Sequence, residues 1–169
     1  QVLDNTGEPV DISGGLIFNG DAVLWGTELE GRILLTDNWS AGGAMSYVQA
    51  EWDGAESPCN DREPGEVLGF CDIDGQNVSG EPEFSLSLNS EFTLPIGGNE
   101  WYLRGLYKYT GETQNQDASA GIGAVTDEFE ERHVLNLYTG VRSTDGKWDA
   151  GLWVKNALDS DEIVRQTGP

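Results

Sequence analysis

The sequence predicts an all-β fold, an antiparallel up-and-down meander of about six long strands that forms part of a transmembrane outer-membrane β-barrel. A polar turn stands directly before a tryptophan three times, at 36–39, 97–101 and 144–148. Each turn joins two long segments in which apolar and polar residues alternate with the period of a β-strand. Long polar stretches separate these hairpins, and bacterial barrels alternate short periplasmic turns with long outer loops in the same way.

The strand candidates follow from this alternation, and most exceed the ~9 to 11 tilted residues that cross a bilayer. Soluble strands average about 5 to 6 residues, so the length favours a membrane. Segment 39–52 alternates ambiguously around Gly42 and Gly43, and 127–139 also resembles a short helix. The predicted strands are 22–35, 39–52, 83–94, 101–112, 128–143 and 147–158.

Charged side chains keep to one face of these strands. In 22–35, for example, Val23 and Leu29 share one parity while Glu28 has the other. A Lys or Arg that faces lipid at the midplane costs about 2 to 4 kcal/mol, so the charged face is expected to line a polar lumen. A half-buried soluble sheet would separate charges in the same way. The lumen-facing candidates are Glu28, Glu30, Arg32, Arg104 and Lys108.

The tryptophans after the turns, Trp39, Trp101 and Trp148, are predicted to lie at a membrane interface. An indole combines an apolar ring with a polar N–H, which suits the boundary between lipid and water. The short turns would then face the periplasm. Segment 1–21 would belong to an extracellular loop, and 159–169 would begin another.

Composition restricts the partners. The formal net charge is -21, from 30 acidic and 9 basic residues. Phosphate binding needs clustered Lys and Arg, so nucleic acid is not an expected partner. The sequence has no apolar run of the ~18 residues that a transmembrane helix requires. A mean hydropathy of -0.43 does not argue against a barrel, because barrel strands alternate and barrel loops are polar.

Two cysteines, Cys59 and Cys71, lie in one polar stretch without the further Cys or His ligands of a zinc site. A local disulfide is the simpler interpretation, and two free buried thiols are the alternative. The bond would contribute roughly 3 kcal/mol and would indicate an oxidising compartment such as the periplasm or the cell surface. Asp72 and Asp74 are weak calcium candidates; an Asx-rich turn is favoured because the EF-hand register is missing. No other cofactor is predicted.

Catalytic residues are scarce, and the chain is not expected to be an enzyme. The sole histidine, His133, lies where alternation places it beside Leu135 and Leu137. It is therefore interpreted as a wall residue and not as a general base. Glu28 and Glu30 share one face, which a polar lumen explains without any substrate.

Two stretches resemble the later barrel strands of TonB-dependent outer-membrane receptors. The first runs from GTELEG at 26–31 through the turn at 36–39 to SYVQA at 46–50. The second, WDAGLWVKNALD at 148–159, is similar to the strand that closes with a V-x-N-L-x-D-like signature shortly before the family's final strands. The resemblance covers nearly the whole chain, in the family's order and spacing.

This resemblance implies a large barrel filled by an amino-terminal plug, with energy supplied through TonB and loops that capture a metal chelate, a vitamin or an oligosaccharide. Residues 1–169 would be one carboxy-proximal barrel segment of the bacterial outer membrane, with its strands within 22–158. The plug, the earlier strands and the terminal strand are not in this sequence, so the segment would not be active alone. Its partners would be lipid, the remaining barrel, the plug and, through the parent receptor, TonB. Six strands are also fewer than the ~8 of the smallest single-chain barrels.

Two alternatives stay open. The first is a soluble secreted β-sandwich that binds carbohydrate or calcium through exposed aromatic rings and loop acids. The second is a stand-alone eight-stranded barrel whose extra strands lie within 1–21 and 159–169.

Overall fold

The structure, a computed structural model, describes residues 2–3, 9–10, 20–58, 70–78, 80–116 and 125–160. Every regular element in this part of the chain is a β-strand. None of these residues forms a helix long and apolar enough to span a bilayer. Contacts group the chain into two compact units, and each is described by itself. The first comprises residues 1–25, 49–81 and 113–128, and the second comprises residues 26–48, 82–112 and 129–169.

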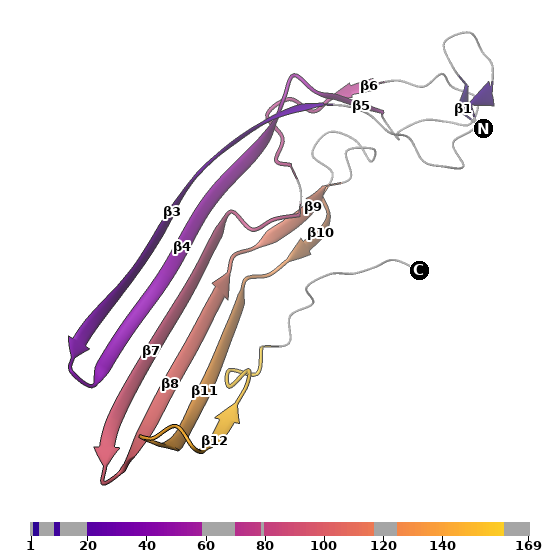
Figure 1. Cartoon of the computed structure of the whole chain (residues 1–169). Helices are drawn as coiled ribbons and strands as arrows, with labels where there is room; N and C mark the ends of the chain where they lie inside the picture. The colour runs from indigo at the N-terminus through magenta and orange to yellow at the C-terminus, as the bar shows by residue number, and fades with distance from the viewer. Residues whose placement is uncertain are drawn as a thin grey trace. The chain divides into compact units, whose positions relative to one another are not determined.

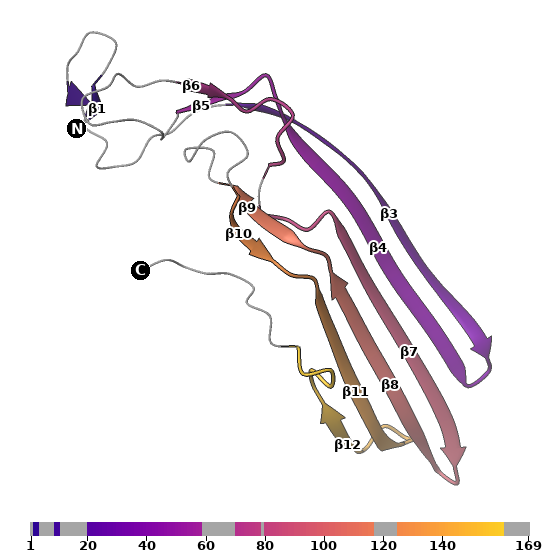
Figure 2. The same cartoon turned by 180° about the vertical axis from the view of Figure 1, so that it is seen from behind.

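Six strands, five of them with 12 to 16 residues, form one sheet in the order β12-β11-β8-β7-β4-β3. Strands that follow one another in this set lie side by side, so the sheet is an up-and-down meander, as both views show (Figures 1 and 2). The predicted all-β fold with an antiparallel meander of six strands is confirmed. The strands are β3 (Asp21–Thr36), β4 (Trp39–Asp53), β7 (Phe84–Ile96), β8 (Asn99–Thr110), β11 (Arg132–Ser143) and β12 (Asp149–Val154).

The two-residue turn at Gly97 and Gly98 sets the register of the central hairpin. Gly97 has a φ of 62°, a left-handed conformation that glycine adopts without the steric cost of a Cβ atom. From this turn β7 and β8 pair continuously as far as Ser85 opposite Thr110. Directly opposite residues face the same side of a sheet, so this register assigns every side chain of the hairpin to one of two faces.

Both long connections contain short strands that the alternation did not predict. In the second connection, β9 (Thr113–Gln116) pairs with β10 (Val125–Phe129). The predicted strand 128–143 is therefore wrong in its first residues, because the regular pairing is interrupted at 130–131 before β11 begins. In the first connection, β5 (Glu56–Pro58) pairs with β6 (Phe70–Asp72).

The last strand is shorter than the predicted 147–158, and its end has a local cause. Asn156 adopts a φ of 51°, a left-handed conformation that Asn tolerates better than most residues. Its backbone N–H donates to Asn136 Oδ1 at 3.0 Å, and its side-chain amide both donates to and accepts from the backbone of Ser160. These bonds turn the chain out of the strand direction after Val154.

The first unit contains a small core next to β5 and β6. Ala55, Ser57 and Ile73 are 2%, 1% and 0% exposed, and the Ile73 backbone N–H donates to the Ala55 carbonyl at 3.0 Å. Two further short strands of this unit, β1 (Val2–Leu3) and β2 (Pro9–Val10), pair with one another. The long connection between β4 and β7, which the sequence predicted as a polar stretch, is therefore folded around this core in its described residues.

The six-stranded sheet has no comparable core in the described part of the chain. Ala55 and Ile73 are the only buried hydrophobic residues there, and neither belongs to the sheet. Instead, Leu88, Leu103 and Leu152 of the sheet are 46%, 44% and 76% exposed. The described sheet is therefore a single layer whose apolar side chains need cover from something else.

Tyr102 of β8 lies across two glycines, Gly140 of β11 and Gly151 of β12. A Cβ atom on Gly140 would stand 2.5 Å from the Ala150 carbonyl oxygen and 2.7 Å from the Tyr102 hydroxyl oxygen. A Cβ atom on Gly151 would stand 2.8 Å from the same hydroxyl. Both positions therefore need glycine so that the ring can cross β11 and β12.

We expect Gly140→Ala to lower the free energy of unfolding by about 1 to 3 kcal/mol, because overpacking forces the backbone and the Tyr102 ring to move. Gly105→Ala is the matched control, since its Cβ atom would meet Leu137 at an ordinary 3.7 Å. Urea unfolding of both variants and the parent chain under the same conditions measures the difference. Equal stability of the two variants would contradict the close approach at Gly140.

Candidate functional site

One face of the sheet carries aromatic side chains at two levels. Phe92 and Trp101 contact one another edge-to-face at 6.3 Å between ring centroids, near the tight turns. Eight residues along the same strands, Phe84 and Tyr109 contact at 5.8 Å. At about 3.4 Å per residue, eight residues span about 27 Å along a strand, or about 21 Å of height at a tilt of about 40°. This height is comparable with the apolar band of about 25 Å on transmembrane barrels.

The zone between the two aromatic levels is uncharged. In β4, β7, β8 and β11, no described residue on this face between these levels is Asp, Glu, Lys or Arg. We call this zone with its two aromatic levels the apolar face. Its larger side chains between the levels are those of Met45, Leu86, Leu88, Leu103, Tyr107, Leu135 and Leu137.

The tryptophans predicted at a membrane interface all lie at the tight-turn end. Trp39 begins β4, is 43% exposed, and donates its indole N–H to Ser90 Oγ at 2.8 Å. Trp101 lies near the start of β8, and Trp148, 48% exposed, directly precedes β12. Their position relative to lipid stays a prediction.

The other end of the apolar face holds His133 in an aromatic cluster. Tyr107 Oη lies 2.7 Å from His133 Nδ1, and Tyr109 donates to Glu131 Oε2 at 2.7 Å. This hydrogen bond from Tyr109 is the main cause that lowers the pKa of Glu131. His133 therefore lies on the apolar face beside aromatic rings, as its alternation with Leu135 predicted.

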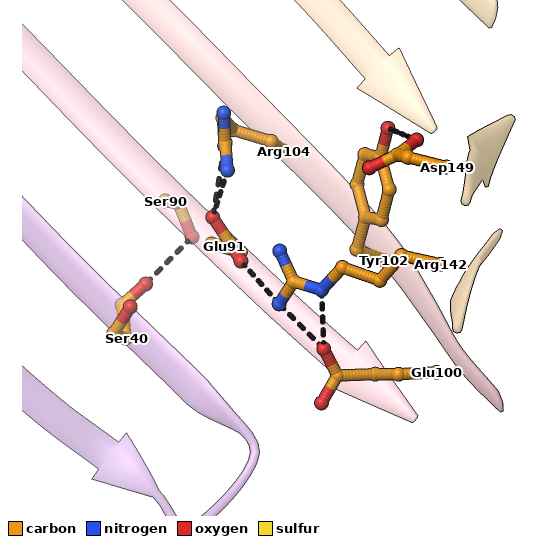
Figure 3. A network of polar contacts seen from close by, with 8 residues as sticks. All are labelled: Ser40, Ser90, Glu91, Glu100, Tyr102, Arg104, Arg142 and Asp149. Carbon is orange, nitrogen blue, oxygen red and sulfur yellow. Dashed lines mark hydrogen bonds and ion pairs between the residues drawn. The ribbon is translucent and has the colours of Figure 1, made fainter. Parts of the chain in front are cut away.

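The opposite face, the polar face, carries an ionic network that joins three strands (Figure 3). Arg104 donates to Glu91 at 2.8 Å, and Arg142 donates to Glu100 at 2.7 Å. Arg142 also reaches the other oxygen of Glu91 at 3.3 Å, so one carboxylate bridges two guanidinium groups. All four side chains are 26% to 41% exposed, so solvent screens the network.

Tyr102 extends this network toward β12. Its hydroxyl donates to Asp149 at 3.1 Å, and the Arg142 guanidinium lies 5.4 Å from its ring centroid (Figure 3). The network therefore links β7, β8, β11 and β12 at the end near the tight turns. Of the predicted lumen-facing residues, Arg104 alone belongs to it.

A second feature of the polar face is an open hollow of about 450 Å³ farther from the tight turns. Glu28, Glu30 and Lys108, three of the predicted lumen-facing residues, line it together. None of these three forms an ion pair with another described residue. Arg32 lies on β3 outside the hollow. The remaining lining residues are Leu29, Ala44, Met45, Ser46, Ser85, Leu86 and Ser87.

The weak calcium candidates have structural roles. Asp74 Oδ1 accepts the Gly54 backbone N–H at 2.7 Å, and Asp72 Oδ1 accepts the Asp74 backbone N–H at 2.9 Å. Within the described ranges, no group of three or more His, Cys, Asp or Glu residues is placed to hold a metal ion. Cys59 lies outside the described residues, so the disulfide between Cys59 and Cys71 stays a prediction.

Sequence reasoning missed three members of the ionic network, Glu91, Glu100 and Arg142. Each alternates with an apolar neighbour and so belongs to the charged parity. The turn at Gly97 and Gly98 also fixes Glu91 opposite Arg104, which a register count from the turn would have found. Arg142 pairs across the long connection between β8 and β11, where no turn fixes the register.

Comparisons with protein families, curated proteins and solved structures find no match to this chain.

The tight turn before Trp148 is stabilised by Asp145. A hydrogen bond from Lys147 is the main cause that lowers the pKa of Asp145, and contact with the Ser143 hydroxyl adds to it. A carboxylate with a lowered pKa stabilises the fold above its unfolded pKa, and this contribution is lost as the pH falls through the folded value. Lys147 and Asp145 are 78% and 51% exposed, so solvent screens their ion pair. The stabilisation by Asp145 is therefore local to the turn.

We expect a double-mutant cycle of Glu100→Gln and Arg142→Gln to give a coupling of about 0.5 to 1 kcal/mol, because the pair is partly exposed and screened. The coupling should decrease as salt rises. Chemical unfolding at low and high salt measures it. The control is the more exposed pair of Asp145 and Lys147, which should have a smaller coupling energy. A coupling energy between Glu100 and Arg142 no larger than that of the control would contradict the network.

Proposed function

We propose that this chain is a wall segment of an outer-membrane receptor or transporter barrel that takes up a nutrient with energy from TonB, and that it is not active alone. The observation that carries the proposal is the apolar face, an uncharged and mainly aliphatic zone bordered by pairs of aromatic rings at both ends. Lipid covers such a face without any second protein layer, and interfacial Trp and Tyr are the usual borders of a barrel's apolar band.

Strand length supports lipid over a packed sandwich. β3, β4, β7, β8 and β11 have 12 to 16 residues, at least twice the usual length of about 5 to 6. Such strands are long enough to cross the bilayer at a tilt. The polar face would then line an aqueous lumen, where the charges of Glu91, Arg104 and Lys108 remain hydrated.

The outer strands of the described sheet are β3 and β12. A strand edge leaves backbone donors and acceptors unpaired, and lipid does not tolerate such groups. The proposal therefore requires other strands of the same barrel to pair with β3 and β12.

The TonB-dependent part of the proposal is supported by the sequence resemblance at 26–50 and 148–159. The nutrient would be a metal chelate, a vitamin or an oligosaccharide, and a plug would occupy the lumen. The location would be the bacterial outer membrane. An antibody raised against this chain should then detect a band well above 18.3 kDa in the outer-membrane fraction.

Adjacent residues of β7 test the membrane placement. Leu88 lies on the apolar face and Asn89 on the polar face. Each is replaced by cysteine, spin-labelled without reduction, and examined by electron paramagnetic resonance with the protein in lipid vesicles. We expect the label at Leu88→Cys to be relaxed by oxygen, which partitions into lipid, and the label at Asn89→Cys by an aqueous nickel complex.

A Leu88 label that the nickel complex relaxes as strongly as the Asn89 label would refute the proposal. A Leu88 label that neither reagent reaches, in protein that stays monomeric without detergent, would favour the soluble β-sandwich. Labels at both sites also control for one another, because the two positions differ by one residue in the same strand.

A further inference from the structure

The two charged features of the polar face differ in how their charges are neutralised. The residues directly opposite Arg104 are Glu91 and Tyr138. The residues directly opposite Lys108, on the same strand, are Ser87 and Val134. Arg104 therefore has a carboxylate directly opposite it, and Lys108 has none.

The hollow beside Lys108 has a floor of small side chains. Ala44, Ser46, Ser85 and Ser87 stand on the two strands between β3 and β8. The hydroxyl groups of Ser46 and Ser85 hydrogen-bond to one another at 2.8 Å. These short side chains leave the 450 Å³ open, a volume within the range of about 300 to 1,000 Å³ that is typical of small-molecule sites.

Opposite charges border this floor. Glu28 and Glu30 come from β3 on one side, and Lys108 comes from β8 on the other. With two strands between them, the backbones of β3 and β8 are roughly 14 Å apart at about 4.8 Å per strand. A molecule that lies across the floor therefore meets carboxylates at one end and an ammonium group at the other.

We infer that this hollow binds a short peptide-like zwitterion, with its ammonium group toward Glu28 and Glu30 and its carboxylate toward Lys108. An extended tripeptide spans about 10 Å between its termini, which fits between side chains that reach inward from the two strands. The serine hydroxyls both donate and accept hydrogen bonds, and so match the amides of a peptide. This inference goes beyond the nutrient classes named above, and it rests on the proposed function only in that the polar face lines the barrel lumen.

Trialanine and its blocked forms test the inference. Calorimetric titration is performed on the full chain in non-ionic detergent with trialanine, N-acetyl-trialanine and trialanine amide. We expect each blocked peptide to bind about tenfold more weakly, because each loses one charge-assisted contact. Lys108→Gln should weaken the binding of trialanine about tenfold, so that trialanine and trialanine amide bind with equal affinity.

The acidic side of the hollow has its own variant. In the double variant Glu28→Gln and Glu30→Gln, trialanine and N-acetyl-trialanine should bind with equal affinity. Trialanine should still bind more tightly than trialanine amide. Lys155→Gln, which lies beyond the end of β12, is the control and should bind all three peptides as the parent chain does. These opposite patterns separate loss of a contact from loss of folding.

Equal binding of the three peptides, or no binding by protein whose Leu88 and Asn89 labels show the expected membrane pattern, would overturn the inference and leave the proposed function standing. If the Leu88 and Asn89 labels do not show the expected membrane pattern, both the proposed function and this inference are wrong. Loss of binding in the Lys155→Gln control would also overturn the inference, because the charges of the hollow would then not be the cause.

Discussion

Cross-strand register is the constraint on which the rest of this structure depends. Side chains alternate along a strand, so a slip of one residue moves every side chain to the opposite face. A slip of β8 would turn Arg104 and Lys108 onto the apolar face and Leu103 onto the polar face. The aromatic levels, the ionic network and the hollow therefore exist only in one register, and the glycine turn at 97–98 holds the central hairpin in it.

Features that depend on local pattern could be predicted from the sequence. Alternation identified the six strands of the sheet and the polar-face positions of Arg104 and Lys108, and turn composition located the three tight turns. The Glu91–Arg104 contact was within reach as well, since a two-residue turn fixes the residues opposite one another along the whole hairpin. These predictions succeed because each rests on contacts between residues near one another in the chain.

Features that depend on distant pairing were beyond that reasoning. The contact of Arg142 with Glu100 needs the register of β11 against β8, which the composition of 113–131 does not define. The early end of β12 arises from Asn156, whose side chain binds Ser160 while its backbone binds Asn136. Alternation predicts neither the Arg142–Glu100 contact nor the end of β12. It indicates the face of the sheet on which a residue lies, but not the residue that it contacts.

The chemistry of the two basic residues of β8 agrees with their different surroundings. A guanidinium group is planar and presents several donors in a fixed fork, so Arg104 and Arg142 share the oxygens of Glu91 with little freedom left to lose. Lys108 carries a compact charge on a flexible stem, which suits a partner whose position the sheet does not fix. Ser87 and Val134, directly opposite, offer it no counter-charge, so in the proposed site a ligand supplies the carboxylate. The polar face thus combines a network whose ion pairs join strands to one another with a hollow whose charged side chains form no ion pair among the described residues.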